Sequence, residues 1–151
     1  MNIVILCGGK GTRLESVSKG KPKILIPIEE KPFIYYLLDC LIKYGFRKIF
    51  LLIAYKSQSI MREIGDFYKG VPITYIKDNK ELKAGTASAL LNAIKILPKH
   101  FLLQYGDTIL NIDYKDFYYK SSTLNNEMLM AIYSNKNHLD KNNVVYKKNK
   151  L

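Results

Sequence analysis

A glycine-rich segment near the amino terminus, residues 7–14, has the composition of a phosphate-binding loop. It reads Cys-Gly-Gly-Lys-Gly-Thr-Arg-Leu and directly follows an apolar run. Glycine has no Cβ atom, so the backbone N–H groups of Gly8, Gly9 and Gly11 can approach a phosphate oxygen closely. The expected ligand of this segment is therefore a phosphate group.

Three basic residues close to these glycines could neutralise a polyphosphate. Arg13 carries a forked guanidinium that suits phosphate oxygens, while Lys21 and Lys23 are compact point charges. Pro22 stands between the two lysines and restricts the backbone beside Lys23. A plain turn with exposed lysines is the alternative, but the combination of glycines and cations favours a site for a polyanion.

Two better-known glycine-rich loops do not fit this segment. The dinucleotide-binding fingerprint would require a glycine at position 14, where leucine stands. A P-loop ending in Gly20-Lys21 would require a glycine at position 15, where glutamate stands, and a Ser or Thr in place of Pro22. The loop is therefore of a different kind.

Two further positions could take part in the same chemistry. Asp107 follows an apolar run and a glycine, and a carboxylate at a strand end can hold Mg²⁺ against phosphate oxygens. Gly85 and Thr86 stand at the start of an expected helix, whose first N–H groups are free to meet a ligand. An ordinary Gly-Asp turn and an ordinary helix cap are the alternatives.

Short apolar runs alternate with amphipathic stretches, which predicts an α/β fold with a mainly parallel sheet. We expect strands at residues 2–7, 48–53, 72–76, 100–105 and 127–133. We expect helices at residues 33–44, from 57 to just before Gly70, at 86–97, and shortly after 113. Ligands of open α/β sheets bind at the carboxyl ends of strands, where the glycine-rich loop and Asp107 would both lie. Nothing after the last expected strand predicts a covering helix, so the sheet should be incomplete at its C-terminal edge.

Composition limits the remaining choices. The chain has 151 residues, 48% of them hydrophobic, and 24 Lys+Arg against 13 Asp+Glu give a net charge of +11. Much of the basic excess lies in single lysines scattered among asparagines, especially at residues 135–150. The lysines are not interleaved with aromatic residues, which argues against nucleic acid as a partner. No apolar run approaches the roughly 20 residues of a membrane span, and we expect no membrane partner. Cys7 and Cys40 lack metal-ligand spacing and predict reduced thiols in a cytoplasmic protein.

The glycine-rich loop with Lys21-Pro22-Lys23 resembles the signature of the sugar-phosphate nucleotidyltransferases. The likeness is nearest to heptose-1-phosphate guanylyltransferases and glucose-1-phosphate thymidylyltransferases. It continues in Lys31-Pro32-Phe33, in Ala84-Gly85-Thr86-Ala87 and in Gly106-Asp107. The resemblance implies a Rossmann-like three-layer α/β/α fold, the nucleotide-diphospho-sugar transferase fold. It also implies a reaction that joins a nucleoside triphosphate to a sugar 1-phosphate and releases pyrophosphate, in nucleotide-sugar biosynthesis for cell-surface polysaccharides.

The resemblance also implies a role for each matching residue. Gly8, Gly9, Gly11 and Thr12 would donate to the triphosphate. Arg13 would neutralise the leaving pyrophosphate and Lys23 would be the cation at the α-phosphate, so these two are the expected catalytic residues. Gly85 and Thr86 would contact the nucleoside, and Asp107 would hold Mg²⁺.

Departures from the family pattern leave alternatives open. Tyr105 replaces the Asn of Asn-Gly-Asp, and Lys83 replaces a usual Pro. Family members also continue into segments that bind the sugar and supply a second acidic metal ligand. We therefore expect a nucleotide-binding core at residues 1–133, a Lys/Asn-rich stretch at 134–151, and a C-terminally truncated enzyme. The alternatives are a non-catalytic nucleotide-binding fragment or degenerate paralogue lacking the sugar-binding half, and a basic interaction protein. The sequence fixes neither the base nor the sugar, and it leaves a homo-oligomer open.

Overall fold

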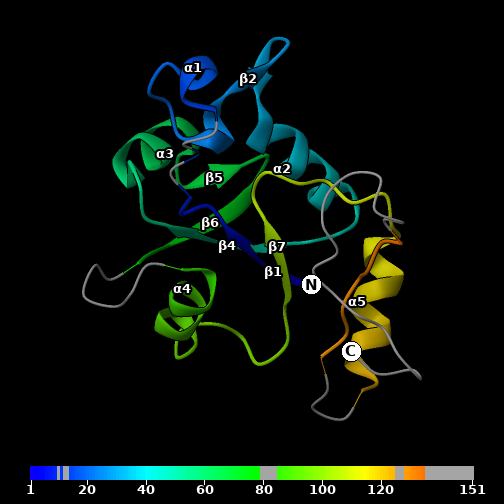
Figure 1. Ribbon diagram of the computed structural model, residues 1–151. Helices are drawn as coiled ribbons and strands as arrows, with labels where there is room; N and C mark the ends of the chain where they lie inside the picture. The colour runs from blue at the N-terminus through cyan, green and yellow to red at the C-terminus, as the bar shows by residue number, and fades with distance from the viewer. Residues whose placement is uncertain (10, 12–13, 79–84, 125–127, 135–151) are drawn as a thin grey trace.

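The computed structural model describes residues 1–9, 11, 14–78, 85–124 and 128–134. Five strands form one sheet in the order β5-β6-β4-β1-β7 (Figure 1). Four of them are parallel: β1 (Asn2–Leu6), β4 (Lys48–Ile53), β6 (Val71–Lys77) and β7 (Leu102–Tyr105). The short β5 (Phe67–Tyr68) runs antiparallel to β6 at one edge. The predicted mainly parallel sheet is confirmed.

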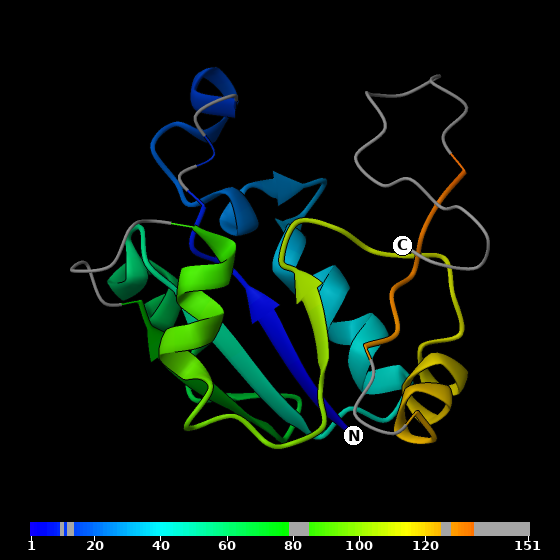
Figure 2. The same ribbon diagram turned by 60° about the horizontal axis from the view of Figure 1, so that its bottom comes forward.

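The central strands are buried on both faces because their apolar residues alternate between two cores. In β1, Ile3 and Ile5 face a large core formed with α2 (Phe33–Lys43), α3 (Ser57–Ile64) and α5 (Tyr114–Ser122). Val4 faces the opposite way, into a smaller core with α4 (Thr86–Ala93). Figure 2 shows α4 and α2 on opposite sides of the sheet. The chain therefore forms the three layers that the family resemblance implies.

Small elements follow β1 at the carboxyl end of the sheet. They are α1 (Glu15–Ser18), a 3₁₀ turn (Lys23–Leu25), and a hairpin of β2 (Pro27–Ile28) and β3 (Lys31–Pro32). Ile24 and Leu25 are buried, so the 3₁₀ turn is anchored in the large core. These elements give the long connection between β1 and α2 a defined path.

The ends of two expected helices differ in the structure. The helix that begins at Ser57 ends at Ile64 because Gly65 adopts a φ of +73°, and the expected last turn of that helix becomes β5 instead. The helix expected over 86–97 ends at Ala93 and is followed by turns. In each case the apolar pattern continues beyond the point where the backbone leaves the helix.

The strand predicted at 127–133 is wrong for the part that the structure describes. Residues 128–134 form neither helix nor strand, and Met128 and Tyr133 are each 79% exposed. A strand requires a partner for its backbone groups, and β7 pairs only with β1 among the described strands. The proposed boundary after residue 133 lies at the edge of the described residues and stays a prediction. No helix in the described residues is long and apolar enough to cross a membrane.

Candidate active site

The site expected from the sequence lies where the direction of strand addition reverses. The chain adds β4 and β6 on one side of β1 and then crosses to place β7 on the other. In open α/β sheets, ligands bind at such a switch point, in the crevice outside the carboxyl ends of the two adjacent strands. The loops here are the glycine-rich segment after β1 and Gly106-Asp107 after β7. The topology therefore brings together two motifs that lie far apart in the sequence.

Gly106 holds the two loops in close contact. Its N–H group donates to the carbonyl oxygen of Leu6 at 3.0 Å. A Cβ atom at Gly106 would lie 2.9 Å from Sγ of Cys7 and 3.1 Å from that same carbonyl oxygen. Cys7 is itself buried, and burial raises the pKa of its thiol, with a smaller contribution from the charge of Asp107. Only glycine allows this approach without displacing a neighbour, and it fixes where Asp107 leaves the sheet.

Lys23 and Asp107 form an ion pair that joins the segment after β1 to the end of β7. The Nζ atom of Lys23 lies 2.5 Å from Oδ2 of Asp107, and the two side chains are 40% and 33% exposed. Pro22 precedes the 3₁₀ turn, and its carbonyl oxygen accepts from the N–H group of Leu25 at 2.8 Å. The turn is thus closed behind Lys23, whose side chain extends toward the end of β7.

The charge state of Asp107 follows from this contact. Partial burial alone would raise the pKa of its carboxyl group. Hydrogen bonds from Lys23 and from the Thr108 hydroxyl, together with the lysine charge, outweigh that effect and lower the pKa below its ordinary value. Asp107 is therefore a carboxylate at neutral pH, as a metal ligand must be.

The glycine-rich loop packs between the end of β4 and the Lys23 turn. A Cβ atom at Gly8 would lie 3.3 Å from Cβ of Ala54, and one at Gly11 would lie 3.1 Å from Cβ of Lys23. Gly11 has a φ of +66°, a conformation that favours glycine. Among the described residues, the N–H groups of Gly8 and Gly9 have no hydrogen-bond acceptor. These two N–H groups can therefore donate hydrogen bonds to an anion.

The expected nucleoside contacts start α4. Gly85 is its N-cap residue, and no side-chain hydrogen bond caps the helix there. Because α4 connects β6 to β7, it runs against the strands and begins at the carboxyl end of the sheet. Thr86 is thus on the same edge as Asp107, although no described hydrogen bond or ion pair joins Gly85 or Thr86 to the Lys23–Asp107 pair.

Thr12 and Arg13 lie outside the described residues, so their assigned roles remain predictions. The same applies to Ala84 in the segment before α4.

Gln104 is a site residue that the sequence analysis missed. Its Nε2 atom donates to the carbonyl oxygen of Thr108 at 2.5 Å, which closes the turn that carries Asp107. Gln104 is only 5% exposed and follows Leu102 by two residues on the large-core side of β7. A polar residue at an inward position of an apolar strand is the signal that could have identified it.

The donor set fits Mg²⁺ only together with a phosphate ligand. In the described parts of the chain, no group of three or more His, Cys, Asp or Glu side chains could hold a metal ion. Mg²⁺ in nucleotide enzymes is bound by one or two carboxylates plus substrate phosphates. Asp107 supplies one such carboxylate, so a metal here would bind with the nucleotide.

A mainly parallel sheet with a glycine-rich loop and an acidic residue at its switch point is typical of α/β proteins that bind ligands at the carboxyl ends of their strands. Residues 2–143 match the nucleotidyl transferase family, and the chain belongs to that family. The resemblance to sugar-phosphate nucleotidyltransferases that the sequence motifs indicate is thereby confirmed.

Similar proteins include sugar-1-phosphate nucleotidyltransferases of different base specificity. The chain is 35% identical over 116 residues to the UTP–glucose-1-phosphate uridylyltransferase AglF of Haloferax volcanii, covering 77% of this chain and 47% of that protein. It is 35% identical over 113 residues to the D-glycero-alpha-D-manno-heptose 1-phosphate guanylyltransferase of Campylobacter jejuni, covering 75% and 50%. Among solved structures, HddC from Yersinia pseudotuberculosis, complexed with GMP-PN, has 37% identity and a TM-score of 0.69, covering 80% and 53%. The chain thus spans about half the length of these proteins.

Proposed function

We propose that this chain carries the nucleotide-binding half of a sugar-1-phosphate nucleotidyltransferase active site. The substrates would be a nucleoside triphosphate and a sugar 1-phosphate, and the products a nucleoside diphosphate sugar and pyrophosphate. The observation that carries the proposal is the Lys23–Asp107 pair at the switch point, beside the open N–H groups of Gly8 and Gly9. Family membership and the activities of the similar proteins support it.

The reaction is mainly a problem of charge and positioning. An oxygen of the sugar phosphate attacks the α-phosphorus, and the bond from that phosphorus to the bridging oxygen of the β-phosphate breaks. The bonding electrons leave with pyrophosphate. Both substrates are anionic and repel one another, so catalysis requires alignment and neutralisation rather than a protein nucleophile.

Each site residue has a distinct part in this proposal. Lys23 stabilises the charge that develops at the α-phosphate. Gly8, Gly9, Gly11 and Thr12 donate to the triphosphate, and Arg13 neutralises the leaving pyrophosphate. Gly85 and Thr86 contact the nucleoside.

Asp107 would hold Mg²⁺ together with phosphate oxygens. When bound there, Mg²⁺ would neutralise part of the phosphate charge. In the ligand-free structure Lys23 occupies Oδ2 of Asp107, so nucleotide binding must move the ammonium from the carboxylate toward the phosphates. Without substrate, Lys23 and Asp107 therefore neutralise each other's charge.

We also propose a cytoplasmic location for the protein. Cys7 and Cys40 are free thiols. The reduced state and the nucleotide substrate are both in keeping with a cytoplasmic location.

The direct test is pyrophosphate release with Mg²⁺, the common nucleoside triphosphates and a panel of sugar 1-phosphates. Calorimetric titration of each triphosphate gives binding independently of turnover. We expect at least one triphosphate to bind saturably, more weakly in Lys23→Met than in the unaltered chain. Release of pyrophosphate with one sugar 1-phosphate establishes the enzyme, whereas triphosphate binding without turnover points to the nucleotide-binding fragment. Absence of both binding and turnover contradicts the proposal.

A further inference from the structure

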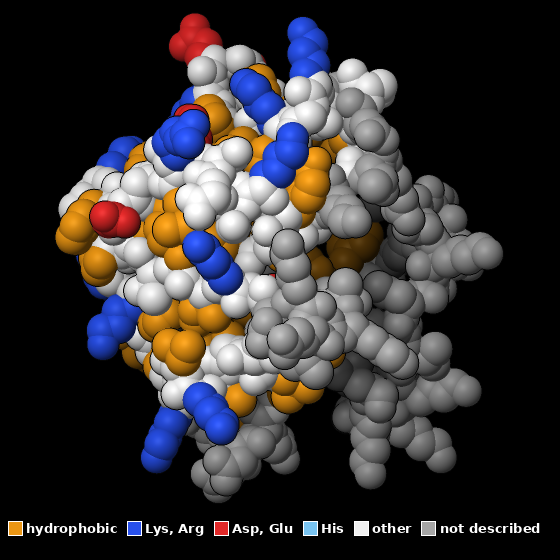
Figure 3. Space-filling model, turned by 90° about the vertical axis from the view of Figure 1, so that its left-hand side faces the viewer, with side chains coloured by type: hydrophobic (Ala, Val, Ile, Leu, Met, Phe, Trp, Pro, Cys, Tyr) orange, Lys and Arg blue, Asp and Glu red, His pale blue; other side chains and the backbone are white. Residues whose placement is uncertain are grey.

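A second group of basic residues lies between the segment that precedes Lys23 and α3. Here the chain forms a pocket of about 290 Å³ that is open to solvent. One wall is formed by residues 19–22, and the other by Lys56, Ser59 and Arg62. Figure 3 shows the face of the molecule on this side, where Lys and Arg side chains are spread among few acidic ones. Lys23 itself does not line this pocket.

The pocket carries an excess of positive charge. Its basic lining residues are Lys19, Lys21, Lys56 and Arg62, and its one acidic residue is Glu63. None of the four basic residues forms an ion pair with another described residue. Like charges gathered in one concave surface raise the local potential and attract anions. The pocket therefore suits an anionic ligand.

The two walls are fixed to each other. The Lys56 ammonium donates to the carbonyl oxygen of Gly20, a contact between residues 36 positions apart. Lys19 and Lys56 both adopt left-handed backbone conformations, with φ values of 46° and 49°. Non-glycine residues reach this region only where the surrounding structure holds them. A merely solvated lysine-rich surface requires none of these features.

Part of the pocket lining is apolar. Pro22, Leu25 and Pro32 belong to the lining, and Pro22 and Leu25 are buried. A ligand with a small carbon skeleton could contact these apolar lining residues while its anionic group meets the lysines and Arg62. The volume is near the lower end of the roughly 300–1,000 Å³ of small-molecule pockets.

From these features we propose that the pocket between residues 19–22 and α3 binds the phosphate group of a small phosphorylated metabolite. The proposed site differs from the triphosphate site in its residues, since Lys21 lines the pocket, whereas Lys23 and Asp107 pair with each other and do not line it. If the proposed nucleotide function holds, a ligand in this pocket would also contact Lys21 and Pro22, which directly precede Lys23.

The test is titration of the ¹⁵N-labelled chain, without nucleotide, by inorganic phosphate and separately by glucose 6-phosphate at constant ionic strength. We expect saturable shifts at Ser59 and Arg62, and binding weakened about tenfold by Arg62→Gln or Lys21→Gln, as for loss of a charge-assisted hydrogen bond. Lys95→Gln removes the same charge from an exposed position outside the pocket and should leave the affinity unchanged. If glucose 6-phosphate binds more tightly than inorganic phosphate, the apolar lining residues contribute to binding. If the two probes bind equally, the pocket recognises the phosphate group alone.

The proposal fails if neither probe saturates, or if Lys95→Gln weakens binding as much as Arg62→Gln. It also fails if the shifts are confined to Gly8, Gly9 and Lys23, which would assign the anion to the crevice. Lys23→Met separates the two sites, because it should weaken triphosphate binding and leave phosphate binding in the pocket intact.

Discussion

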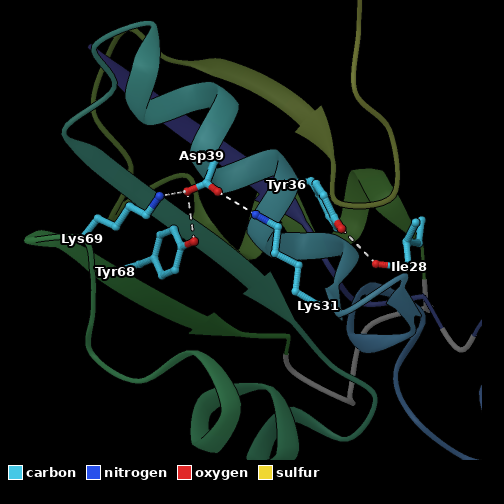
Figure 4. Close-up of polar contacts among 6 residues, drawn as sticks. All are labelled: Ile28, Lys31, Tyr36, Asp39, Tyr68 and Lys69. Atoms are coloured by element: carbon cyan, nitrogen blue, oxygen red, sulfur yellow. Dashed lines mark hydrogen bonds and ion pairs between the residues drawn. The ribbon is translucent and has the colours of Figure 1, made fainter.

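Two lysine–aspartate pairs in this molecule have the same chemistry and different surroundings. Lys23 pairs with Asp107 at 2.5 Å, and Lys31 pairs with Asp39 at 2.8 Å, with the lysines 40% and 39% exposed. The Asp39 carboxylate also accepts from Lys69 at 2.6 Å and from the Tyr68 hydroxyl at 3.0 Å (Figure 4). Asp107 has Lys23 and only a neighbouring hydroxyl as its other described side-chain partner, at 3.2 Å.

The difference separates a carboxylate held by several structural contacts from one that could accept a further ligand. Asp39 lies on α2, and its partners come from β3 and from the turn around β5. These contacts join three elements and leave the carboxylate few free lone pairs. Asp107 lies beside unoccupied backbone donors at a strand end and keeps capacity for another ligand. A lysine–aspartate contact alone therefore identifies neither role; the remaining coordination of the carboxylate does.

The largest expected effect comes from removing the two lysine charges in turn. In the proposed reaction, Lys23→Met should lower the rate of pyrophosphate release by about 10²–10³-fold, because the charge that develops at the α-phosphate would lose its stabilising partner. Lys31→Met is the matched control, since it breaks an equally exposed pair on Asp39 and should change the rate less than about threefold. Steady-state kinetics of the two variants decide the comparison. Similar losses in both would mean that the Lys23–Asp107 pair is also only structural.

The second prediction concerns the backbone that places Asp107. Gly106→Ala should lower the free energy of unfolding by about 1–3 kcal/mol, because the added Cβ would overlap Sγ of Cys7 and the Leu6 carbonyl oxygen. Gly9→Ala is the control, since a Cβ at Gly9 has no neighbour within 4 Å. Urea denaturation measures both variants. Equal stability of Gly106→Ala and the unaltered chain would show that the strand ends separate easily.

A third prediction concerns replacement of each aspartate by asparagine. Asp39→Asn should lower the free energy of unfolding by about 1 kcal/mol, since it weakens contacts with partly exposed partners. Asp107→Asn should change stability less and should instead remove the Mg²⁺ dependence of triphosphate binding. Thermal denaturation and calorimetry with and without Mg²⁺ test the two halves of the prediction. Metal dependence that persists in Asp107→Asn would exclude this residue as the ligand.

The smallest expected effect is on the free energy of unfolding at acid pH. Burial acts to raise the pKa of Asp39, but hydrogen bonds from Lys31, Lys69 and Tyr68 lower it from 3.8 to about 2. The unfolded chain therefore binds more protons than the folded chain between about pH 4 and pH 2. The contribution of Asp39 is present above pH 4 and is lost as the pH falls through this window. Denaturation at several pH values should show a shallower acid dependence in Asp39→Asn, and an unchanged slope would rule out the lowered pKa.

Much of the fold is predictable because the apolar pattern determines it locally. The runs that form β1 and β4 are apolar at successive positions, as strands buried on both faces must be. The glycine-rich loop is recognisable because its chemistry lies within a few consecutive residues. These features depend on the neighbouring sequence and need no knowledge of distant contacts.

Other features depend on partners that the local sequence does not contain. Phe67 and Tyr68 fit a helical pattern, yet they form a strand because β6 offers its edge. Residues 128–134 have a strand-like composition, yet they have no partner among the described strands. The contact between Lys23 and Asp107 spans 84 positions and arises from the order of the strands. Gln104 likewise acquires its role only when the turn to Thr108 is formed.

The order of the strands also determines where this sheet can be extended. On the β6 side the short strand β5 pairs with Val71 and Pro72 and so covers one end of that edge. On the opposite side the four residues of β7 have no second partner strand among the described residues. A polypeptide segment, from this chain or another, could pair with the whole length of β7. It would then emerge next to Asp107, so enlarging the sheet and adding side chains to the crevice would be a single structural event.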